Sequence, residues 1–191
     1  MNFFQAIILG IVQALTEYLP VSSSAHIRII GDLMLGADPG AAFTAIIQIG
    51  TELAVILYFR RDIINILSHW FGCLFGKNGP DWRARMGRGD KYATLGWNVI
   101  VGSIPIIILG FTLQNIIETS LRNLWITVTV LFLFGLLLWI VDARSRQIKT
   151  MDDMNYRDAF LFGLGQSMAL IPGVSRSGGT ITVGRALGYT R

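Results

Sequence analysis

A short polar segment, residues 172–180 (PGVSRSGGT), combines an arginine with glycines and hydroxyl side chains inside an otherwise apolar stretch. Glycines let backbone N–H groups turn toward an anion, and a helix that begins near Ser177 directs its positive end to the same place. Arg176 can bind phosphate oxygens through two parallel hydrogen bonds. A Ser/Gly helix cap beside an arginine that extends to the membrane surface is the simpler alternative. The expected ligands of a phosphate site are Gly173, Ser175, Arg176, Ser177, Gly178 and Thr180.

A second group of reactive side chains lies in residues 13–26 (QALTEYLPVSSSAH). Gln13 and Glu17 are four positions apart, so they share one face of a helix, and Gln13 is a candidate substrate-binding residue. The Glu17 carboxylate can bind a hard divalent cation such as Mg²⁺ or Ca²⁺ through oxygen, or accept a proton as a general base. The alternative is a buried carboxyl group that is neutral or paired with an arginine.

Ser23 is the candidate nucleophile of this second group. A serine hydroxyl attacks poorly until a neighbouring base takes its proton. The available bases are Glu17 and His26, which is three residues after Ser23. Ser22 and Ser24 are expected either to cap the following helix or to contact substrate.

The two groups lie in stretches that resemble each other. When residues 10–31 are shifted by 153 positions (163 − 10), they align without gaps on residues 163–184. Weakly similar, interrupted segments in two halves of a membrane protein indicate an inverted repeat with a binding site between the halves. Two unrelated kinked helices are the alternative. Identical pairs include Gly10 and Gly163, Gln13 and Gln166, Ser22 and Ser175, and Ser24 and Ser177.

The composition is that of a membrane protein. The chain of 191 residues is 52% hydrophobic and 15% charged, whereas a soluble domain carries about 25% charged residues. The net charge of +4 is small, and it indicates membrane topology and not nucleic-acid binding. Cys73 is the single cysteine of the sequence, so no internal disulfide can form.

Three apolar runs, 41–59, 95–116 and 124–141, are predicted to cross the membrane. The run at 3–15 is short for a crossing, and Pro20 stops it. A new helix is expected to begin near Ala25. Helix, break and helix at this length predict a re-entrant pair, in which the chain enters and leaves on the same side.

Basic residues set the expected topology. The loops 60–94 and 142–157 carry arginines and lysines near the ends of the spans, so they are expected on the cytoplasmic side, and 117–123 is expected outside. Three spans between the two copies are an odd number. The copies therefore enter the membrane from opposite sides, as an inverted repeat requires.

These features predict an all-α integral membrane protein with transmembrane helices and two re-entrant helix pairs in an inverted repeat. We expect a single membrane domain over 1–191, with the first repeat in 1–141 and the start of the second in 156–191. Three spans follow the first copy, and symmetry predicts that three more follow the second. The sequence is therefore expected to be truncated at its C-terminus.

Segments 13–26 and 172–180, together with 47–57 (IQIGTELAVIL), resemble the bacterial undecaprenyl-diphosphate phosphatases, a family linked to bacitracin resistance. The resemblance covers essentially the whole chain. Gln13 stands where many members have Glu. The resemblance implies an enzyme of the bacterial inner membrane that converts undecaprenyl diphosphate to undecaprenyl phosphate and inorganic phosphate, recycling the lipid carrier for cell-wall synthesis.

The resemblance also implies a site and its requirements. By position, the expected catalytic residues are Glu17, Ser23, His26 and Arg176, with a divalent cation near Glu17 and an active site that opens to the periplasmic side. The expected partners are a polyprenyl diphosphate lipid, the membrane and a second copy in a homodimer. A non-catalytic flippase for a polyprenyl phosphate is the alternative function, because inverted re-entrant repeats are also a transporter architecture.

Overall fold

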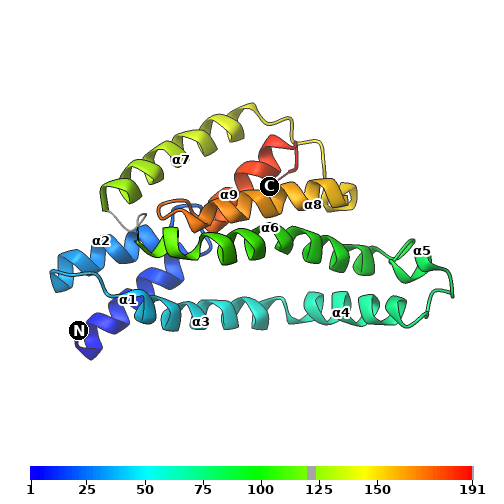
Figure 1. Cartoon of the computed structure of the whole chain (residues 1–191), viewed down its shortest axis with the longest axis horizontal. Helices are drawn as coiled ribbons and strands as arrows, with labels where there is room; N and C mark the ends of the chain where they lie inside the picture. Colours follow the sequence, from blue (N-terminus) through cyan, green and yellow to red (C-terminus); the bar gives the residue numbers. More distant parts are fainter. Residues whose placement is uncertain (120–123, 191) are drawn as a thin grey trace.

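Figure 1 shows the computed structural model of the chain, which describes residues 1–119 and 124–190. The first helix pair is α1 (Phe3–Thr16) and α2 (Ser23–Leu35). The Asn2 side chain accepts a hydrogen bond from the Gln5 N–H, and the Gln5 side chain accepts one from the Asn2 N–H, so a capping box starts α1. A helix of 14 residues spans about 21 Å, which is less than an apolar membrane core of about 30 Å. The predicted break around Pro20 is confirmed.

The second helix pair is α8 (Tyr156–Ser167) and α9 (Arg176–Ala186), separated by a 3₁₀ turn, Met168–Leu170, and the Pro-Gly break. Glycines bring its helices into backbone contact. A Cβ on Gly179 would overlap the carbonyl oxygen of Gly165 in the partner helix. The two halves of this pair therefore pack more closely than side chains would permit.

Long helices connect the two pairs. α6 (Lys91–Thr119) and α7 (Leu124–Arg144) are each long and apolar enough to cross a membrane. α3 (Ala41–Tyr58) and α4 (Arg60–Leu74) meet at a bend of 72° and supply a third span if they count as one broken helix. The chain is therefore a multi-pass helical membrane protein.

The prediction that residues 60–94 form a loop was wrong for much of its length. The structure contains α4 there, then the short α5 (Trp82–Arg85), and α6 starts at Lys91. Helix α4 packs along α6, where the rings of Trp70 and Trp97 are 5.3 Å apart. The basic residues at the start of α4 obscured this apolar face in the sequence.

Helices α6 and α8 form the most extensive contact between elements. Here too the backbones touch, because a Cβ on Gly163 of α8 would overlap the carbonyl oxygen of Gly102 in α6. Helix α8 thus fixes the second pair to α6, a helix long enough to cross the membrane.

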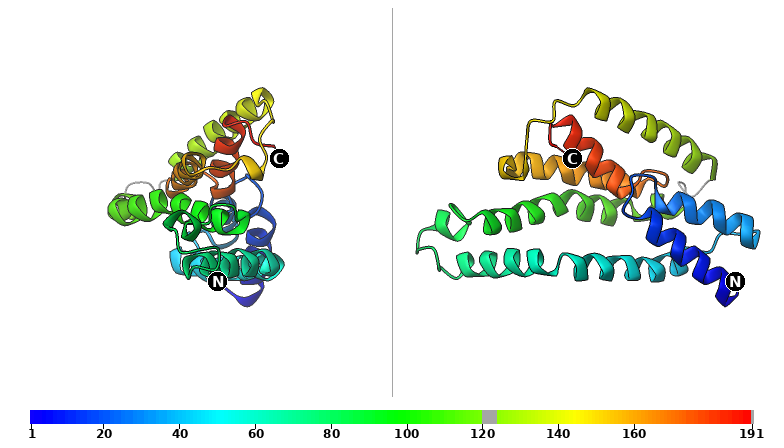
Figure 2. Two further views of the ribbon diagram at one scale, coloured as in Figure 1. Left: turned by 90° about the vertical axis from the view of Figure 1, so that its right-hand side faces the viewer. Right: turned by 180° about the vertical axis from the view of Figure 1, so that it is seen from behind.

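The two broken pairs point toward each other from opposite ends of the long axis of the molecule, and their tips meet near its middle (Figures 1 and 2). The Ser177 hydroxyl at the start of α9 donates to the carbonyl oxygen of Leu19, in the break between α1 and α2, at 2.8 Å. Segments that are 158 residues apart are joined here. This opposed arrangement is the one that the inverted repeat predicted.

The basic connections lie together. The α5 region and the segment 145–155 occupy the same end of the long axis (Figure 1), and an ion pair joins Lys91 to Asp152 across them. This agrees with the prediction that both loops lie on one side of the membrane. The predicted outside connection, 117–123, falls largely on residues 120–123, which lie outside the described residues.

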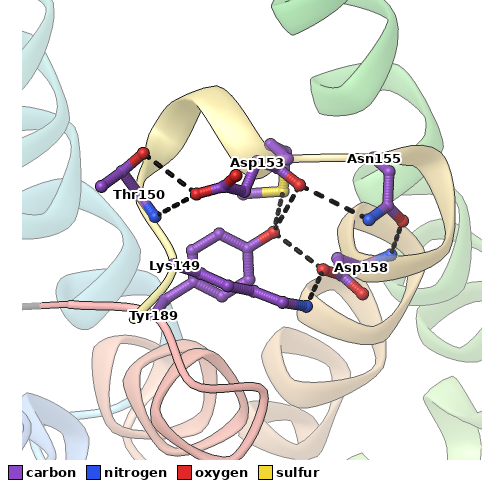
Figure 3. Close-up of polar contacts among 7 residues, drawn as sticks. Lys149, Thr150, Asp153, Asn155, Asp158 and Tyr189 are labelled. Atoms are coloured by element: carbon purple, nitrogen blue, oxygen red, sulfur yellow. Dashed lines mark hydrogen bonds and ion pairs between the residues drawn. The ribbon is translucent and has the colours of Figure 1, made fainter. Parts of the chain in front are cut away.

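A buried network closes the base of the second pair, opposite its tip (Figure 3). The Asp158 carboxylate accepts hydrogen bonds from Lys149 Nζ and the Tyr189 hydroxyl, both at 2.8 Å. Burial alone would raise the pKa of Asp158, but these donors outweigh it and hold the pKa below its usual value. Lys149 and Tyr189 also form a parallel β-bridge. The network ties the start of α8 to the residues after α9.

We expect Tyr189→Phe to lower the unfolding free energy by about 1.5–3 kcal/mol, because a buried carboxylate loses a hydrogen-bond donor. The Asp158 pKa is depressed in the folded state, so its contribution is full above the unfolded pKa of about 3.9 and is lost as pH falls through the folded value. The difference from wild type should therefore be present at pH 7 and shrink in acid. Thermal unfolding in detergent measures it.

The matched control is Tyr156→Phe, since Tyr156 is an exposed tyrosine at the start of α8, the helix that carries Asp158. Equal melting temperatures for wild type and Tyr189→Phe at pH 7 would contradict a stabilising role for the network.

Candidate active site

A cavity of about 190 Å³ lies where the two tips meet. Glu17 and Ser23 of the first pair line it together with Ser175 and Arg176 of the second. The predicted acid–base group and the predicted phosphate-binding group therefore face one space. The other lining residues are Gln13, Ser22, Ser24, Thr44, Gln48, Ala169 and Val174.

Glu17 and Ser23 are in direct contact. Helix α1 ends at Thr16 with Glu17 as its C-cap, and the break turns the chain so that Ser23, the first residue of α2, returns to Glu17. The Ser23 hydroxyl donates to Glu17 Oε2 at 2.5 Å, and Gln13 Nε2 donates to the same oxygen at 2.8 Å. Of the two bases that the sequence left open for Ser23, the carboxylate is the one that touches it.

Ser22 holds this turn in an uncommon conformation. Its φ of 62° is positive, a region that residues other than glycine rarely adopt, and its side chain is buried. Such backbone persists only where the surrounding structure enforces it, and it is typical of functional sites. Its hydroxyl lies 3.2 Å from that of Ser24 and makes no side-chain cap bond to the helix. Ser22 therefore occupies the N-cap position of α2, as one of the two alternatives expected, but its side chain makes no capping hydrogen bond.

His26 lies one turn away from the Glu17–Ser23 pair. Its Nδ1 is 2.9 Å from the carbonyl oxygen of Ser22. A carbonyl only accepts, so Nδ1 carries the hydrogen, and Nε2 of a neutral ring is an acceptor. His26 is not among the residues that line the cavity in the part of the chain that the structure describes.

The hydroxyl groups of the second tip mainly hold the structure together. Ser177 and Ser175 lie 2.9 Å apart, and both approach the Leu19 carbonyl, at 2.8 and 3.5 Å. The Thr180 hydroxyl donates to the carbonyl oxygens of Arg176 and Ser177 within its own helix. The first backbone N–H groups of α9 and the Arg176 side chain are the strongest donors that this tip offers an anion.

The two predicted glycine ligands have packing roles in the structure. Gly173 has φ +102°, and a Cβ there would overlap the carbonyl oxygen of Thr127 in α7. A Cβ on Gly178 would lie 3.0 Å from the Ser175 Cβ. Both glycines let the second tip approach its neighbours closely.

Arg176 pairs with Glu52 of α3, which lies in the family-like segment 47–57. Its Nη1 is 3.7 Å from Glu52 Oε1, and Gln48 Nε2 donates to the same carboxylate oxygen at 3.0 Å. Nearly half of the Arg176 side chain is exposed, so the guanidinium is loosely held. The Gln48–Glu52 pair repeats the four-residue spacing of Gln13 and Glu17, a signal that could have placed it at the site.

A second, wider chamber of about 600 Å³ adjoins the first and shares Glu17 and Arg176 with it. Tyr18, Val55 and Ile56 give this chamber an apolar wall. A ligand with one anionic end and one apolar end therefore fits the two spaces together.

The oxygen atoms near Glu17 suit a hard cation. Gln13 Oε1 is buried and has no hydrogen-bond partner among the described residues. The Nε2 atom of the same side-chain amide donates to Glu17. Hard divalent cations take oxygen ligands and often keep water or substrate phosphate in the remaining positions. Within residues 1–119 and 124–190, no three His, Cys, Asp or Glu side chains gather as a ready-made metal cage.

Fold and site define a multi-pass membrane protein with a polar, anion-suited cavity between two opposed, broken helix pairs. The model of the family described as bacitracin resistance protein BacA matches residues 6–191. The chain belongs to this family, as the sequence motifs predicted.

Named relatives agree with this assignment. The chain is 90% identical over 191 residues to an undecaprenyl-diphosphatase of Bifidobacterium longum subsp. infantis and 72% identical to one of Bifidobacterium adolescentis. A protein of the same name from Micrococcus luteus is 54% identical over 192 residues. Each match covers 100% of this chain, and the chain spans 65% of the length of the Bifidobacterium relatives and 66% of that from Micrococcus.

We expect Gly173→Ala to destabilise the protein by at least about 2 kcal/mol, because it combines a positive φ with a clash against helix backbone that cannot move cheaply. Gly135→Ala is the control, since Gly135 lies in α7 with nothing within 4 Å of its Cβ position. Thermal unfolding in detergent compares the two. Similar melting temperatures for both variants would mean that the tip tolerates a side chain at position 173.

Proposed function

We propose that the complete protein is an undecaprenyl-diphosphatase that hydrolyses undecaprenyl diphosphate to undecaprenyl phosphate and inorganic phosphate. It acts in the bacterial cell membrane and returns the lipid carrier to cell-wall synthesis. The observation that carries the proposal is the 2.5 Å hydrogen bond from Ser23 to Glu17 in a cavity that Arg176 also lines. The names of the relatives support the same substrate.

In the proposed mechanism, the Ser23 oxygen attacks the terminal phosphorus while Glu17 Oε2 takes the hydroxyl proton. The new bond joins Ser23 to phosphorus, and the bond between that phosphorus and the bridging oxygen breaks. Undecaprenyl phosphate leaves with the bridging oxygen. Water then attacks the phosphoserine, and inorganic phosphate leaves as Ser23 regains its proton. Phosphoryl transfer depends mainly on positioning and on neutralising charge.

Arg176 and the first N–H groups of α9 bind the diphosphate in this mechanism. The guanidinium exchanges its 3.7 Å pairing with Glu52 for the more highly charged diphosphate. Ser22, Ser24 and Ser175 line the same cavity and supply further polar contacts. The prenyl chain extends along the apolar wall of the wider chamber, which meets the catalytic cavity at Glu17 and Arg176.

A divalent cation, Mg²⁺ or Ca²⁺, would be held by Glu17 and the amide oxygen of Gln13. When bound, it neutralises part of the negative charge of the diphosphate. Many members of the family have a second carboxylate where this chain has Gln13, which supplies a neutral oxygen. In this chain, Glu52 on α3 places a further carboxylate beside the adjoining chamber.

The site is proposed to open toward the periplasmic side. The basic segments at the α5 end of the molecule support a cytoplasmic location for that end. The base of the second pair lies at the same end, so its tip reaches toward the other side of the membrane (Figure 1). Association of two copies into a homodimer is part of the same proposal, and it rests on the family resemblance.

We expect Glu17→Gln, Ser23→Ala and Arg176→Ala each to lower kcat/KM for a long-chain polyprenyl diphosphate at least about a hundredfold. The three variants remove, in that order, the proton acceptor, the nucleophile and the cation that binds the diphosphate. Phosphate release by the complete protein in detergent measures this. Release without a membrane gradient also separates hydrolysis from transport. Asp62→Asn, Ser68→Ala and Arg61→Ala, on the exposed face of α4, are the matched controls.

The nucleophile has its own test. The Glu17–Ser23 contact favours Ser23, while His26 Nε2 and direct attack by water remain chemical rivals. Rapid quenching with labelled diphosphate, followed by peptide mapping, is expected to place the phosphoryl group on Ser23. Label on His26, or turnover with no trapped phosphoenzyme in any variant, would end the serine mechanism.

Removing divalent cations with a chelator is expected to abolish phosphate release, and Mg²⁺ or Ca²⁺ should restore it. Gln13→Ala should raise the cation concentration needed for half-maximal activity, because an oxygen ligand is lost. Gln5→Ala, at the far end of α1, is the control. Unchanged activity in chelator would remove the cation from the proposal.

A further inference from the structure

A third cavity, of about 280 Å³, adjoins the catalytic cavity and shares Ser24, Thr44 and Gln48 with it. Among the described residues, it shares no lining residue with the wide apolar chamber. Its remaining polar wall comes from Arg28 and Asp38 of the first pair and its loop, and from Thr127 of α7. The mechanism above uses none of Arg28, Asp38 and Thr127.

Arg28 is only partly satisfied in this cavity. Its Nη1 forms an ion pair with Asp38. Its Nε is buried and has no hydrogen-bond partner among the residues that the structure describes. A guanidinium carries five N–H donors in a fixed fork, and one carboxylate cannot serve them all. Arg28 therefore keeps a donor, Nε, that no group among the described residues uses.

Asp38 is held in place by its own loop. The Gly40 N–H donates to Asp38 Oδ1 at 3.0 Å, and α3 begins directly after Gly40. The carboxylate thus stands where an anion bound to Arg28 would lie close to it. It acts as a built-in competitor, so anion binding at Arg28 would be weak and reversible.

We propose that the Arg28 cavity is a second anion site, which accepts the inorganic phosphate after it leaves the catalytic cavity. The site rests on the proposed function. The phosphate passes along Ser24 and Thr44, the residues common to both cavities, while the lipid product remains in the chamber lined by Tyr18 and Val55. The two products then leave by separate routes, and Arg176 is freed for the next diphosphate.

The same chemistry would also suit the phosphate group of a lipid, so the test carries two ligands. Inorganic phosphate and a short-chain polyprenyl monophosphate are each used as inhibitors of diphosphate hydrolysis by the complete protein. A free phosphate site predicts that Arg28 and Asp38 alter inhibition by inorganic phosphate and leave inhibition by the monophosphate unchanged.

The decisive comparison uses two variants that break one ion pair in opposite ways. Arg28→Gln removes the cation, and the inhibition constant for inorganic phosphate should rise about three- to tenfold, as for a partly exposed charged contact. Asp38→Asn removes the competitor, and the same constant should fall by a similar factor. Arg61→Gln and Asp62→Asn, at two exposed positions of α4, are the charge-matched controls. They should leave the inhibition constant for inorganic phosphate unchanged.

Opposite shifts in the two variants support the anion site. Shifts in the same direction, or none, overturn it, because a purely structural ion pair would be broken equally by both changes. An effect on polyprenyl monophosphate alone also overturns the proposed exit route. If Arg28→Gln fails to fold, Asp38→Asn still decides, since tighter phosphate binding cannot come from misfolding. No phosphate release by the wild-type protein would instead contradict the proposed function itself.

Discussion

The site depends on one backbone oxygen, the carbonyl of Leu19. It lies in the break between α1 and α2, where the helix no longer supplies a partner, and it accepts the Ser177 hydroxyl at 2.8 Å. In an apolar environment such a group must be satisfied by protein. The break in one pair therefore requires the tip of the other, and the contact that satisfies the backbone also sets Glu17 and Arg176 around one cavity. The contact that satisfies the break thus also assembles the candidate site.

Glycines determine how closely the supporting elements approach. The second tip reaches α7 only because position 173 has no side chain, and α8 reaches α9 through Gly165 and Gly179. At its other end the pair is closed by the Asp158 network. The loop at the second tip is thereby held by backbone contacts at the tip and by buried charge at the base.

Much of this could be predicted from the sequence, because the signals were local. Pro20 and the Pro172-Gly173 step mark the breaks, and the shift of 153 positions relates the two copies. The prediction that Glu17 and Arg176 face one space followed from that symmetry and is confirmed. Helix α4 was missed because Arg60 and Arg61 resemble the end of a span. The contact of Trp70 with α6 is a tertiary contact, which local sequence does not encode.

Within the site, the sequence could name the groups but not their partners. Ser23 had two bases within reach by spacing, and only the turn at Ser22, with its positive φ, decides that the carboxylate touches it. The pairing of Glu52 with Arg176 joins α3 to α9, and no periodicity within either segment encodes it. Ser175 lines the cavity as the sequence predicted, and its hydroxyl and that of Ser177 also approach the Leu19 carbonyl, a contact that the sequence could not name.

The seam between α6 and α8 has a consequence for how the molecule can move. At Gly102 and Gly163 the two main chains touch with no side chains between them, so no rotamer change can loosen that joint. Close-packed interiors shift between discrete arrangements and do not stretch. The second pair and α6 must therefore travel as one rigid body. Any movement that widens the cavity has to hinge elsewhere, at the bend between α3 and α4 or along the first pair.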